Sequence, residues 1–161
     1  MLFFLDSNEP VHMGYLGDEP AAREKFAKIS QFLDSALLRI RSEGRRRITE
    51  TVNLERVLGT VSVLETGPDD EIVWAQRRGK RWLSRFVKNR APEATSLITV
   101  LLVAAAHGGY KLVDAYLGPF VPYEKTNPKH GHNRVSREFW DNHAFLWSEE
   151  WIIPDSEAVG G

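Results

Sequence analysis

The chain has 161 residues, a formal net charge of −1 at pH 7 and no cysteine. This charge excludes a protein that is basic throughout, so any nucleic-acid role must rest on a local patch. The lack of cysteine excludes disulfides, thiolate zinc sites and cysteine nucleophiles, and it favours a cytoplasmic location. Hydrophobic residues make up 42% of the chain, which is enough for a globular core.

The length fits one domain spanning residues 1–161. Residues 1–19 contain Pro and Gly with little periodicity and are expected to form an irregular leader, and residues 154–161 are expected to form a loose tail. The apolar run at 2–5 ends at Asp6 without a basic flank, so we do not expect a signal peptide. No stretch approaches the ~20 apolar residues that span a bilayer, so no membrane association is expected.

The clearest helix is predicted over residues 20–43. Its apolar residues recur at spacings of three and four, which places them on one face: Phe26, Ile29, Phe32, Leu33, Ala36, Leu37 and Ile40. Pro20 stands in the first turn, and Gly44 is expected just beyond the C-terminus. We therefore expect an amphipathic helix packed on a sheet.

Between about residues 47 and 118 the pattern changes to the alternation typical of strands. Strands are predicted over 48–52, 60–64, 71–77, 81–88, 97–105 and 110–117. The turn sequences at 78–80 and 107–109 join the last four strands into two hairpins. These connections require antiparallel order, because a parallel crossover takes a dozen or more residues. The predicted fold class is α+β, with an antiparallel β-meander sheet packed against the N-terminal helix.

A short C-terminal helix is predicted after a loop over 119–134 that is rich in Pro, Lys, His and Asn. Asn133 or Ser136 is expected to cap it. One face of this helix is predicted to carry Val135, Phe139, Trp140, His143 and Trp147. That face favours a hydrogen-bonded core histidine at 143, with a catalytic histidine as the alternative.

The most informative local feature is a basic block without an intervening acid. It consists of Arg77, Arg78, Lys80, Arg81, Arg85, Lys88 and Arg90. These side chains are expected to contact phosphates, while Trp74, Trp82 and Phe86 offer rings for base stacking. The alternative is a solvated hairpin whose charge is balanced by acids nearby in the sequence, namely Glu65, Asp69, Asp70 and Glu71.

A second candidate set has the same strand phase, which would place its members on one sheet face. It consists of Ser84, Thr99, Asp114 and Tyr116. Because Leu101 and Leu112 have that phase too, the alternative is an ordinary buried face. If the face is open, the polar side chains need a purpose, because unpaired buried carboxylates are costly.

The histidines give weaker signals. His130 and His132 form a pair, but zinc usually takes three or four protein ligands, so no metal site is predicted. His107 stands in a turn between two strands, from where a neutral imidazole can act as a general base. The phosphate-binding glycine motifs are missing, so no cofactor is expected.

Four segments resemble a group of small uncharacterised bacterial proteins, over about residues 55–147. They are DEIVWAQR at 70–77, SRFVKNR at 84–90, YKLVDAYLG at 110–118 and SREFWDNHA at 136–144. More distantly, the expected architecture is similar to the ribonuclease toxin fold of barnase-like and RelE-like proteins. That resemblance implies RNA cleavage without metal by sheet-borne Arg, Lys, His, Ser, Thr or Tyr side chains.

Two functions are therefore considered. The first is an RNA-directed binding or metal-independent cleaving domain that uses the basic hairpin. Its phosphate-binding residues would be Arg77, Arg78, Lys80, Arg81, Lys88 and Arg90, and its catalytic candidates are Arg85, His107, Tyr116 and His143. The second is a noncatalytic protein–protein interaction module that docks an acidic partner. The sequence leaves open whether the chain is an enzyme.

Overall fold

The computed structural model describes residues 3–13, 20–149 and 152, with the side chains of 20–25 outside the description. The chain divides into two compact units, and each is assembled from two stretches of sequence. Unit 1 comprises Met1–Thr60 and Ala94–Phe120, and unit 2 comprises Val61–Glu93 and Val121–Gly161. Each unit has a sheet and a hydrophobic cluster of its own. Because the stretches alternate along the chain, no linker between the units is visible in the sequence.

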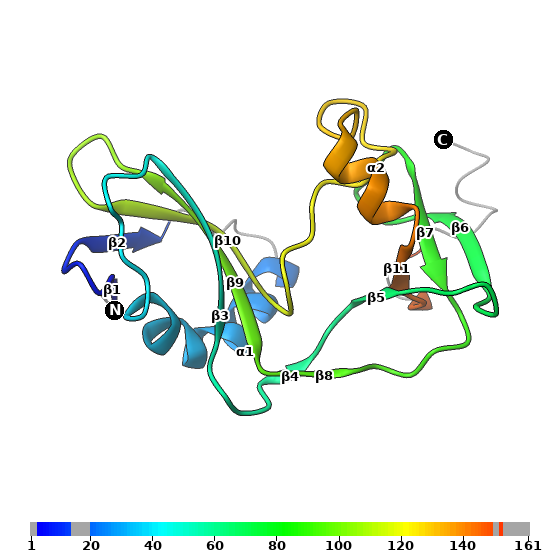
Figure 1. Cartoon of the computed structure of the whole chain (residues 1–161), viewed down its shortest axis with the longest axis horizontal. Coiled ribbons are helices and arrows are strands. Elements are labelled where there is room, and N and C mark those ends of the chain that lie inside the picture. Colours follow the sequence, from blue (N-terminus) through cyan, green and yellow to red (C-terminus); the bar gives the residue numbers. More distant parts are fainter. Residues whose placement is uncertain (1–2, 14–19, 150–151, 153–161) are drawn as a thin grey trace. The chain divides into compact units, whose positions relative to one another are not determined.

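Unit 1 contains one long helix and most of the strands (Figure 1). Its elements are β1 (Phe3–Phe4), β2 (Pro10–Met13), α1 (Pro20–Leu37), β3 (Arg47–Asn53), β4 (Gly59–Thr60), β8 (Ala94–Thr95), β9 (Leu97–Ala104) and β10 (Tyr110–Leu117). The order in the main sheet is β1-β2-β10-β9-β3, in which only β2 and β10 pair in parallel. The strands β4 and β8 form a separate pair.

Two short strands lie in the segment that was expected to be an irregular leader. Neither strand has enough alternating residues to be recognised alone, and both are held by pairing, β2 with β10 and β1 with β2. The rest of the expected leader, at 14–19, and the expected tail at 154–161 lie outside the described residues. No helix in the described part of the chain has the length and apolar character needed to cross a membrane.

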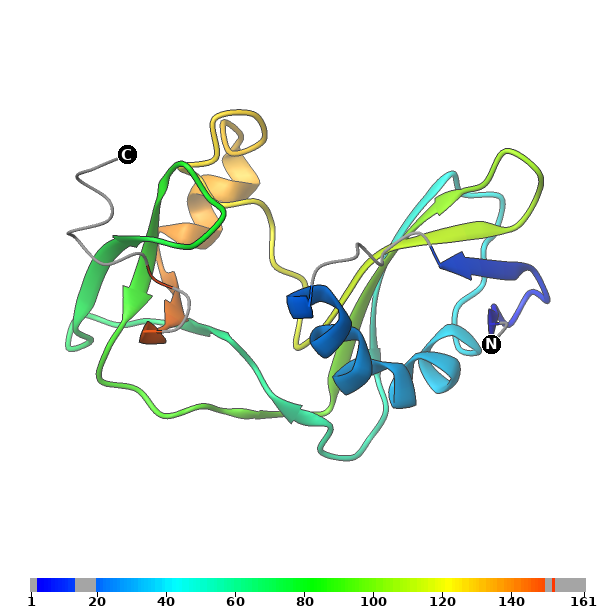
Figure 2. The same cartoon turned by 180° about the vertical axis from the view of Figure 1, so that it is seen from behind.

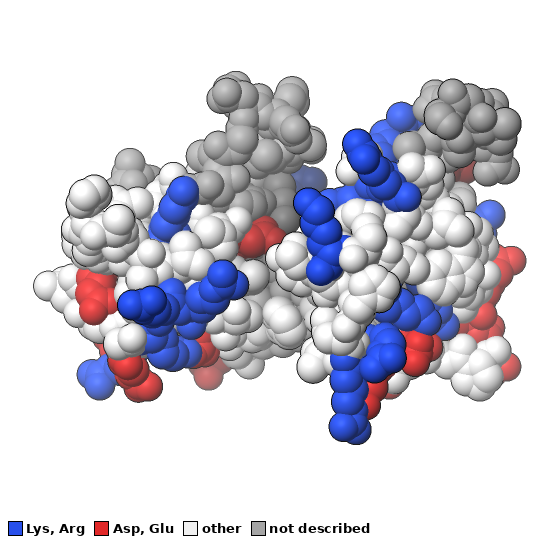
Figure 3. Space-filling model, turned by 90° about the horizontal axis from the view of Figure 1, so that it is seen from above, with Lys and Arg blue, Asp and Glu red and all other residues white. Residues whose placement is uncertain are grey.

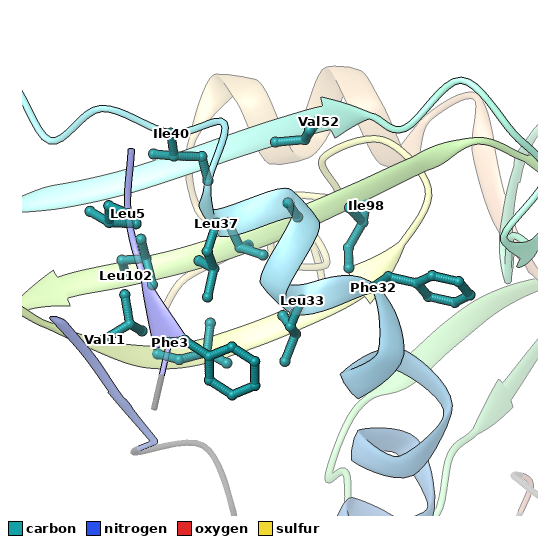
Figure 4. Close-up of a cluster of buried hydrophobic side chains, with 14 of the residues drawn as sticks. Phe3, Leu5, Val11, Phe32, Leu33, Leu37, Ile40, Val52, Ile98 and Leu102 are labelled. Atoms are coloured by element: carbon teal, nitrogen blue, oxygen red, sulfur yellow. The ribbon is translucent and has the colours of Figure 1, made fainter. Parts of the chain in front are cut away.

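The helix α1 packs its apolar side on one face of the unit 1 sheet, as predicted. Figure 2 shows the helix in front of the strands, and Figure 4 shows Leu33 and Leu37 beside Ile98 and Leu102. Its predicted core residues are buried except Phe26, which is only partly buried: Ile29, Phe32, Leu33, Ala36, Leu37 and Ile40. The amphipathic pattern therefore identifies the buried side of the helix correctly.

The predicted end of this helix at residue 43 is wrong, because α1 ends at Leu37. The amides of Arg39 and Ile40 donate to carbonyls three residues back, at 3.1 Å each, which tightens the last turn. The Ile40 carbonyl then accepts from the amide of Asp6 at 2.9 Å, while the Ile40 side chain is buried. Gly44 has a positive φ of 74° but lies in a later turn instead of at the helix end.

The antiparallel pairing of β9 with β10 is confirmed, with Tyr110 opposite Ala104 at one end and Leu117 opposite Ile98 at the other. The turn between them uses positive φ at both Gly108 and Gly109. A register shift after Leu112 marks a β-bulge. Because of this bulge, Leu112 faces the core, whereas Asp114 and Tyr116 face the side of the sheet away from α1. Strict alternation along the sequence would have placed all three residues on one face.

Unit 2 contains the other predicted hairpin. Its elements are β5 (Val63–Glu65), β6 (Ile72–Gln76), β7 (Leu83–Val87), α2 (Arg134–Trp140) and β11 (His143–Leu146), in the sheet order β5-β11-β7-β6. The β6–β7 hairpin and the β9–β10 hairpin therefore lie in different sheets and do not form one continuous meander. The strand β11, which the sequence did not reveal, pairs in parallel with β7 on the side of β7 away from β6.

Asn133 caps α2, as predicted, because its side chain accepts from the Ser136 amide at 2.8 Å. The expected shared face from Val135 to Trp147 is wrong. The helix ends at Trp140, which is buried, while Val135 is 62% exposed. His143 follows in β11, so the helical spacing does not apply to it.

Truncation of Leu33 tests the packing of α1 on the sheet. Leu33→Ala removes a fully buried side chain and should lower the free energy of unfolding by about 2–5 kcal/mol, because the cavity closes only partly. Leu38→Ala is the matched control, because Leu38 is 47% exposed and its loss should cost about 0.5 kcal/mol or less. Urea unfolding measures both variants, and equal losses would contradict this packing.

Candidate functional site

The β6–β7 hairpin has two different faces. Residues directly opposite each other in an antiparallel pair share a face. Phe86 and Ala75 pack in the hydrophobic cluster of unit 2, which defines the inner face. Trp74 lies directly opposite Arg85, and both have the other phase of their strands, so they share the outer face. Trp74 is 43% exposed there.

A charged group surrounds this exposed tryptophan. The Lys125 ammonium lies 5.6 Å from the centroid of a Trp74 ring and donates to the Asp141 carboxylate at 2.6 Å. Arg85 Nη1 donates to the hydroxyl of Thr66 at 2.8 Å and to the carbonyl of His143 at 2.9 Å. We call Trp74, Arg85, Lys125 and Asp141 the Trp74 surface; among the described residues, His143 contacts it only through its backbone carbonyl. The surface joins side chains from β6, β7, the loop before α2 and the end of α2.

Positive charge predominates on the Trp74 surface. The hydrogen bond from Lys125 lowers the pKa of Asp141 below its usual value, and the charges of Arg85 and Arg137 act in the same direction. Partial burial lowers the pKa of Arg85, opposed by Asp141 and Asp70, but an arginine remains charged at neutral pH. The Trp74 surface itself holds two cations, Arg85 and Lys125, and one carboxylate, Asp141, which leaves net positive charge for an anionic ligand.

His143 is held in one orientation and one tautomer. Its ring stacks on Phe139 with centroids 3.8 Å apart and planes 9° apart. Nδ1 lies 2.8 Å from the Phe139 carbonyl oxygen, which can only accept, so in the neutral ring Nδ1 carries the proton. The Asn142 side-chain oxygen, at 2.6 Å from Nδ1, fits the same assignment. In the described part of the chain Nε2 has no hydrogen-bond partner.

Part of the basic block is used within unit 2. Arg77 pairs with Glu124 at 3.1 Å, and its guanidinium carbon lies 4.2 Å from the centroid of the Phe145 ring. Arg90 pairs with Asp70 at 3.1 Å and with Glu93 at 2.7 Å. For these two arginines the alternative of internal charge balance describes the structure better than phosphate binding. Figure 3 likewise shows Asp and Glu side chains beside several of the Lys and Arg clusters.

The other members of the block face solvent to different degrees. Arg78, Arg81 and Lys88 are exposed, and Lys80 is half-buried. The Lys88 ammonium lies 4.3 Å from the centroid of a Trp147 ring, and the Lys80 ammonium lies 5.6 Å from a Trp82 ring. The hairpin therefore presents cations next to aromatic rings.

Sequence reasoning missed Glu124, which stands in the loop predicted over 119–134. This carboxylate is 8% exposed and accepts from Arg77 and from the indole nitrogen of Trp82, the latter at 2.9 Å. Its second oxygen is buried without a partner among the described atoms. Sequence reasoning did not place Lys125 and Asp141 beside Trp74 either, because their contacts join distant segments and form no motif.

The structure divides the predicted catalytic set. Arg85 and His143 belong to unit 2, where Arg85 donates to the backbone carbonyl of His143, whereas His107 and Tyr116 belong to unit 1. His107 is exposed in the β9–β10 turn, and Tyr116 lies opposite Thr99 on the outer face of the unit 1 sheet. Thr99, Asp114 and Tyr116 do lie on one face of a sheet, as predicted. Ser84 does not join them, because it is buried in unit 2.

The His130 and His132 pair gains no further ligand. Among the described residues no group of three His, Asp or Glu side chains is arranged to hold a metal ion. The His130 ring stacks on Tyr123 with centroids 4.6 Å apart. This contact gives the loop histidine an ordinary packing role.

Comparisons with protein-family models, curated proteins and solved structures give no match for this chain. The resemblance to bacterial proteins and to the ribonuclease toxin fold therefore stays a prediction. Function can be inferred only from the side chains that the fold brings together.

Removal of the buried carboxylate tests its role in holding the hairpin. Glu124→Ala leaves the largely buried Arg77 without its ion-pair partner and should lower the free energy of unfolding by about 3–5 kcal/mol. Glu93→Ala breaks the pair with Arg90, in which Glu93 is 56% exposed, and should cost about 1 kcal/mol or less. Urea unfolding of the two variants checks the difference. A Glu124→Ala protein as stable as Glu93→Ala would show that the buried pair is dispensable.

Proposed function

We propose that unit 2 binds single-stranded RNA through the β6–β7 hairpin and the Trp74 surface. The observation that carries this proposal is the exposed Trp74, which has Arg85 directly opposite it and the Lys125 ammonium near its ring. An aromatic platform beside cations is the arrangement by which proteins hold unpaired bases and their phosphates. A stacked base contributes about 1–3 kcal/mol to binding, whatever its identity.

The exposed cations of the hairpin supply the phosphate contacts in this proposal. They are Arg78, Arg81 and Lys88. Arg77 and Arg90 act instead by fixing the hairpin through their acidic partners. The exposed charge is therefore smaller than a block of seven cations suggests, and the binding should be correspondingly moderate and sensitive to salt.

Metal-independent RNA cleavage is a second candidate, favoured by the fixed tautomer of His143. Its Nε2 is free to accept the proton of a ribose 2′-hydroxyl as the 2′-oxygen attacks the phosphorus. Arg85, whose guanidinium donates to the backbone carbonyl of His143, is the cation that would balance charge on the phosphate, and the departing 5′-oxygen would take its proton from water. This version uses residues of unit 2 only, without His107 or Tyr116.

The binding proposal is tested by fluorescence anisotropy of a labelled single-stranded RNA over a range of salt concentrations. Replacing Arg78, Arg81 and Lys88 together by Ala should weaken binding and reduce the slope of log affinity against log salt by about 2, because each phosphate contact contributes about 0.7. Trp74→Ala should weaken binding about 5- to 150-fold and leave the slope unchanged.

Arg134→Ala is the control for this experiment. Arg134 is an exposed cation of unit 2 that already pairs with Glu138, so its loss should leave RNA affinity unchanged. If the unmodified chain fails to bind RNA at low salt, the proposal is wrong. The noncatalytic module for an acidic protein partner would then be the better function.

Cleavage is tested by incubating RNA with the full chain in excess chelator. His143→Ala should lower the rate about 10²- to 10⁴-fold, the usual contribution of a general base, while His107→Ala should leave it unchanged. Cleavage that survives His143→Ala would exclude this histidine as the base. An unmodified chain that binds RNA and leaves it intact would restrict the function to binding.

A further inference from the structure

One row of side chains crosses the unit 1 sheet on the side opposite α1. In the register of the sheet, Lys111 of β10 is the central residue, with His12 of β2 on one side and Val103 of β9 on the other. Val103 in turn lies beside Arg47 of β3. Residues aligned in this way share a face. The row therefore places three basic side chains and one valine on a single line across four strands.

Burial shows which face the row occupies. The residues next to the row in sequence are in the core cluster that includes α1: Val11, Tyr110, Leu102 and Ile48. Because side chains alternate along a strand, the row must face away from that core. His12, Lys111 and Arg47 are all exposed. We call these three residues the outer basic row.

The members of the outer basic row have no internal partner. Among the described residues no hydrogen bond or ion pair involves the side chain of His12, Arg47 or Lys111. Two of the arginines that precede β3 differ: Arg41 pairs with Asp6 at 2.9 Å, and Arg45 pairs with Glu50 at 2.9 Å. The charge of the row is thus available to a ligand, whereas the charge of those arginines is largely balanced.

The spacing of the row fits a chain of phosphates better than a single anion. Neighbouring strands lie about 4.8 Å apart, so Lys111 is about 5 Å from His12 and about 10 Å from Arg47 along the sheet. The three positions therefore span about 15 Å, which successive phosphates of a strand can fill. Thr49 is exposed on the same face, two residues from Arg47, and its hydroxyl can donate to a phosphate oxygen.

We propose that the outer basic row binds the phosphate backbone of a nucleic-acid strand that lies across β3, β9, β10 and β2. The row supplies charge and hydroxyl donors from a sheet, with no exposed tryptophan in it. This binding is independent of the Trp74 surface, because it uses only residues of unit 1. Contacts of this kind position a strand without reading its sequence.

The test uses the full chain and a labelled single-stranded RNA at several salt concentrations. The double variant Arg47→Ala with Lys111→Ala should reduce the slope of log affinity against log salt by about 1.4, because two phosphate contacts are lost. Arg47→Lys with Lys111→Arg should retain the slope. The matched control, Arg41→Ala with Arg134→Ala, removes two cations that have acidic partners and should leave the slope unchanged.

Two results would overturn the proposal. One is a slope for the Ala double variant equal to that of the control. The other comes from the variant in which Arg78, Arg81 and Lys88 are all replaced by Ala. If tripolyphosphate at an equal phosphate concentration displaces the RNA from this variant, the row is a site for any polyphosphate and not for a nucleic-acid strand. Because that triple variant changes only unit 2, failure of the row and failure of the Trp74 surface are separately visible.

Discussion

The arrangement of unit 1 depends on α1 covering a single face of its sheet. Ile48, Val100 and Leu112 must face the helix, because burying their side chains supplies the stability of the unit. Alternation then sends their neighbours outward, and a slip of one residue would exchange the two faces. The bulge after Leu112 shifts the alternation of β10 by one residue, so that Ala115 is the next side chain of this strand in the core. The outer basic row is thus placed by the burial of its apolar neighbours.

Unit 2 depends on a different constraint, the buried carboxylate of Glu124. The carboxylate accepts hydrogen bonds from Arg77, just after β6, and from Trp82, just before β7. One loop residue therefore binds both sides of the hairpin turn. A buried charge is costly unless paired, and this pairing removes Arg77 from the cations open to a ligand. Arg90 is used in the same way by Asp70 and Glu93. The basic block therefore combines residues that build the hairpin with residues that face solvent.

Local pattern predicts those parts of this chain that local physics determines. The buried face of α1, the turn at Gly108 and Gly109 and the Asn133 cap all follow from short-range spacing and residue chemistry. The end of α1, the strand β11 and the separation of the hairpins into two sheets depend on partners far away in sequence. Arg85 and His143 were named together as catalytic candidates, and that role stays a prediction. Their actual contact, from a guanidinium to a backbone carbonyl, is invisible to any motif.

The two proposed surfaces differ in what they can recognise. Trp74 offers a ring face, and a base can stack on it only when that base is unpaired and turned away from its neighbours. The outer basic row offers cations and a threonine hydroxyl, which contact phosphates in single strands and duplexes alike. Selection for unpaired RNA would therefore come from unit 2, while unit 1 would add affinity that is blind to base pairing. A duplex would retain the contacts with Arg47 and Lys111 and lose the stacking on Trp74.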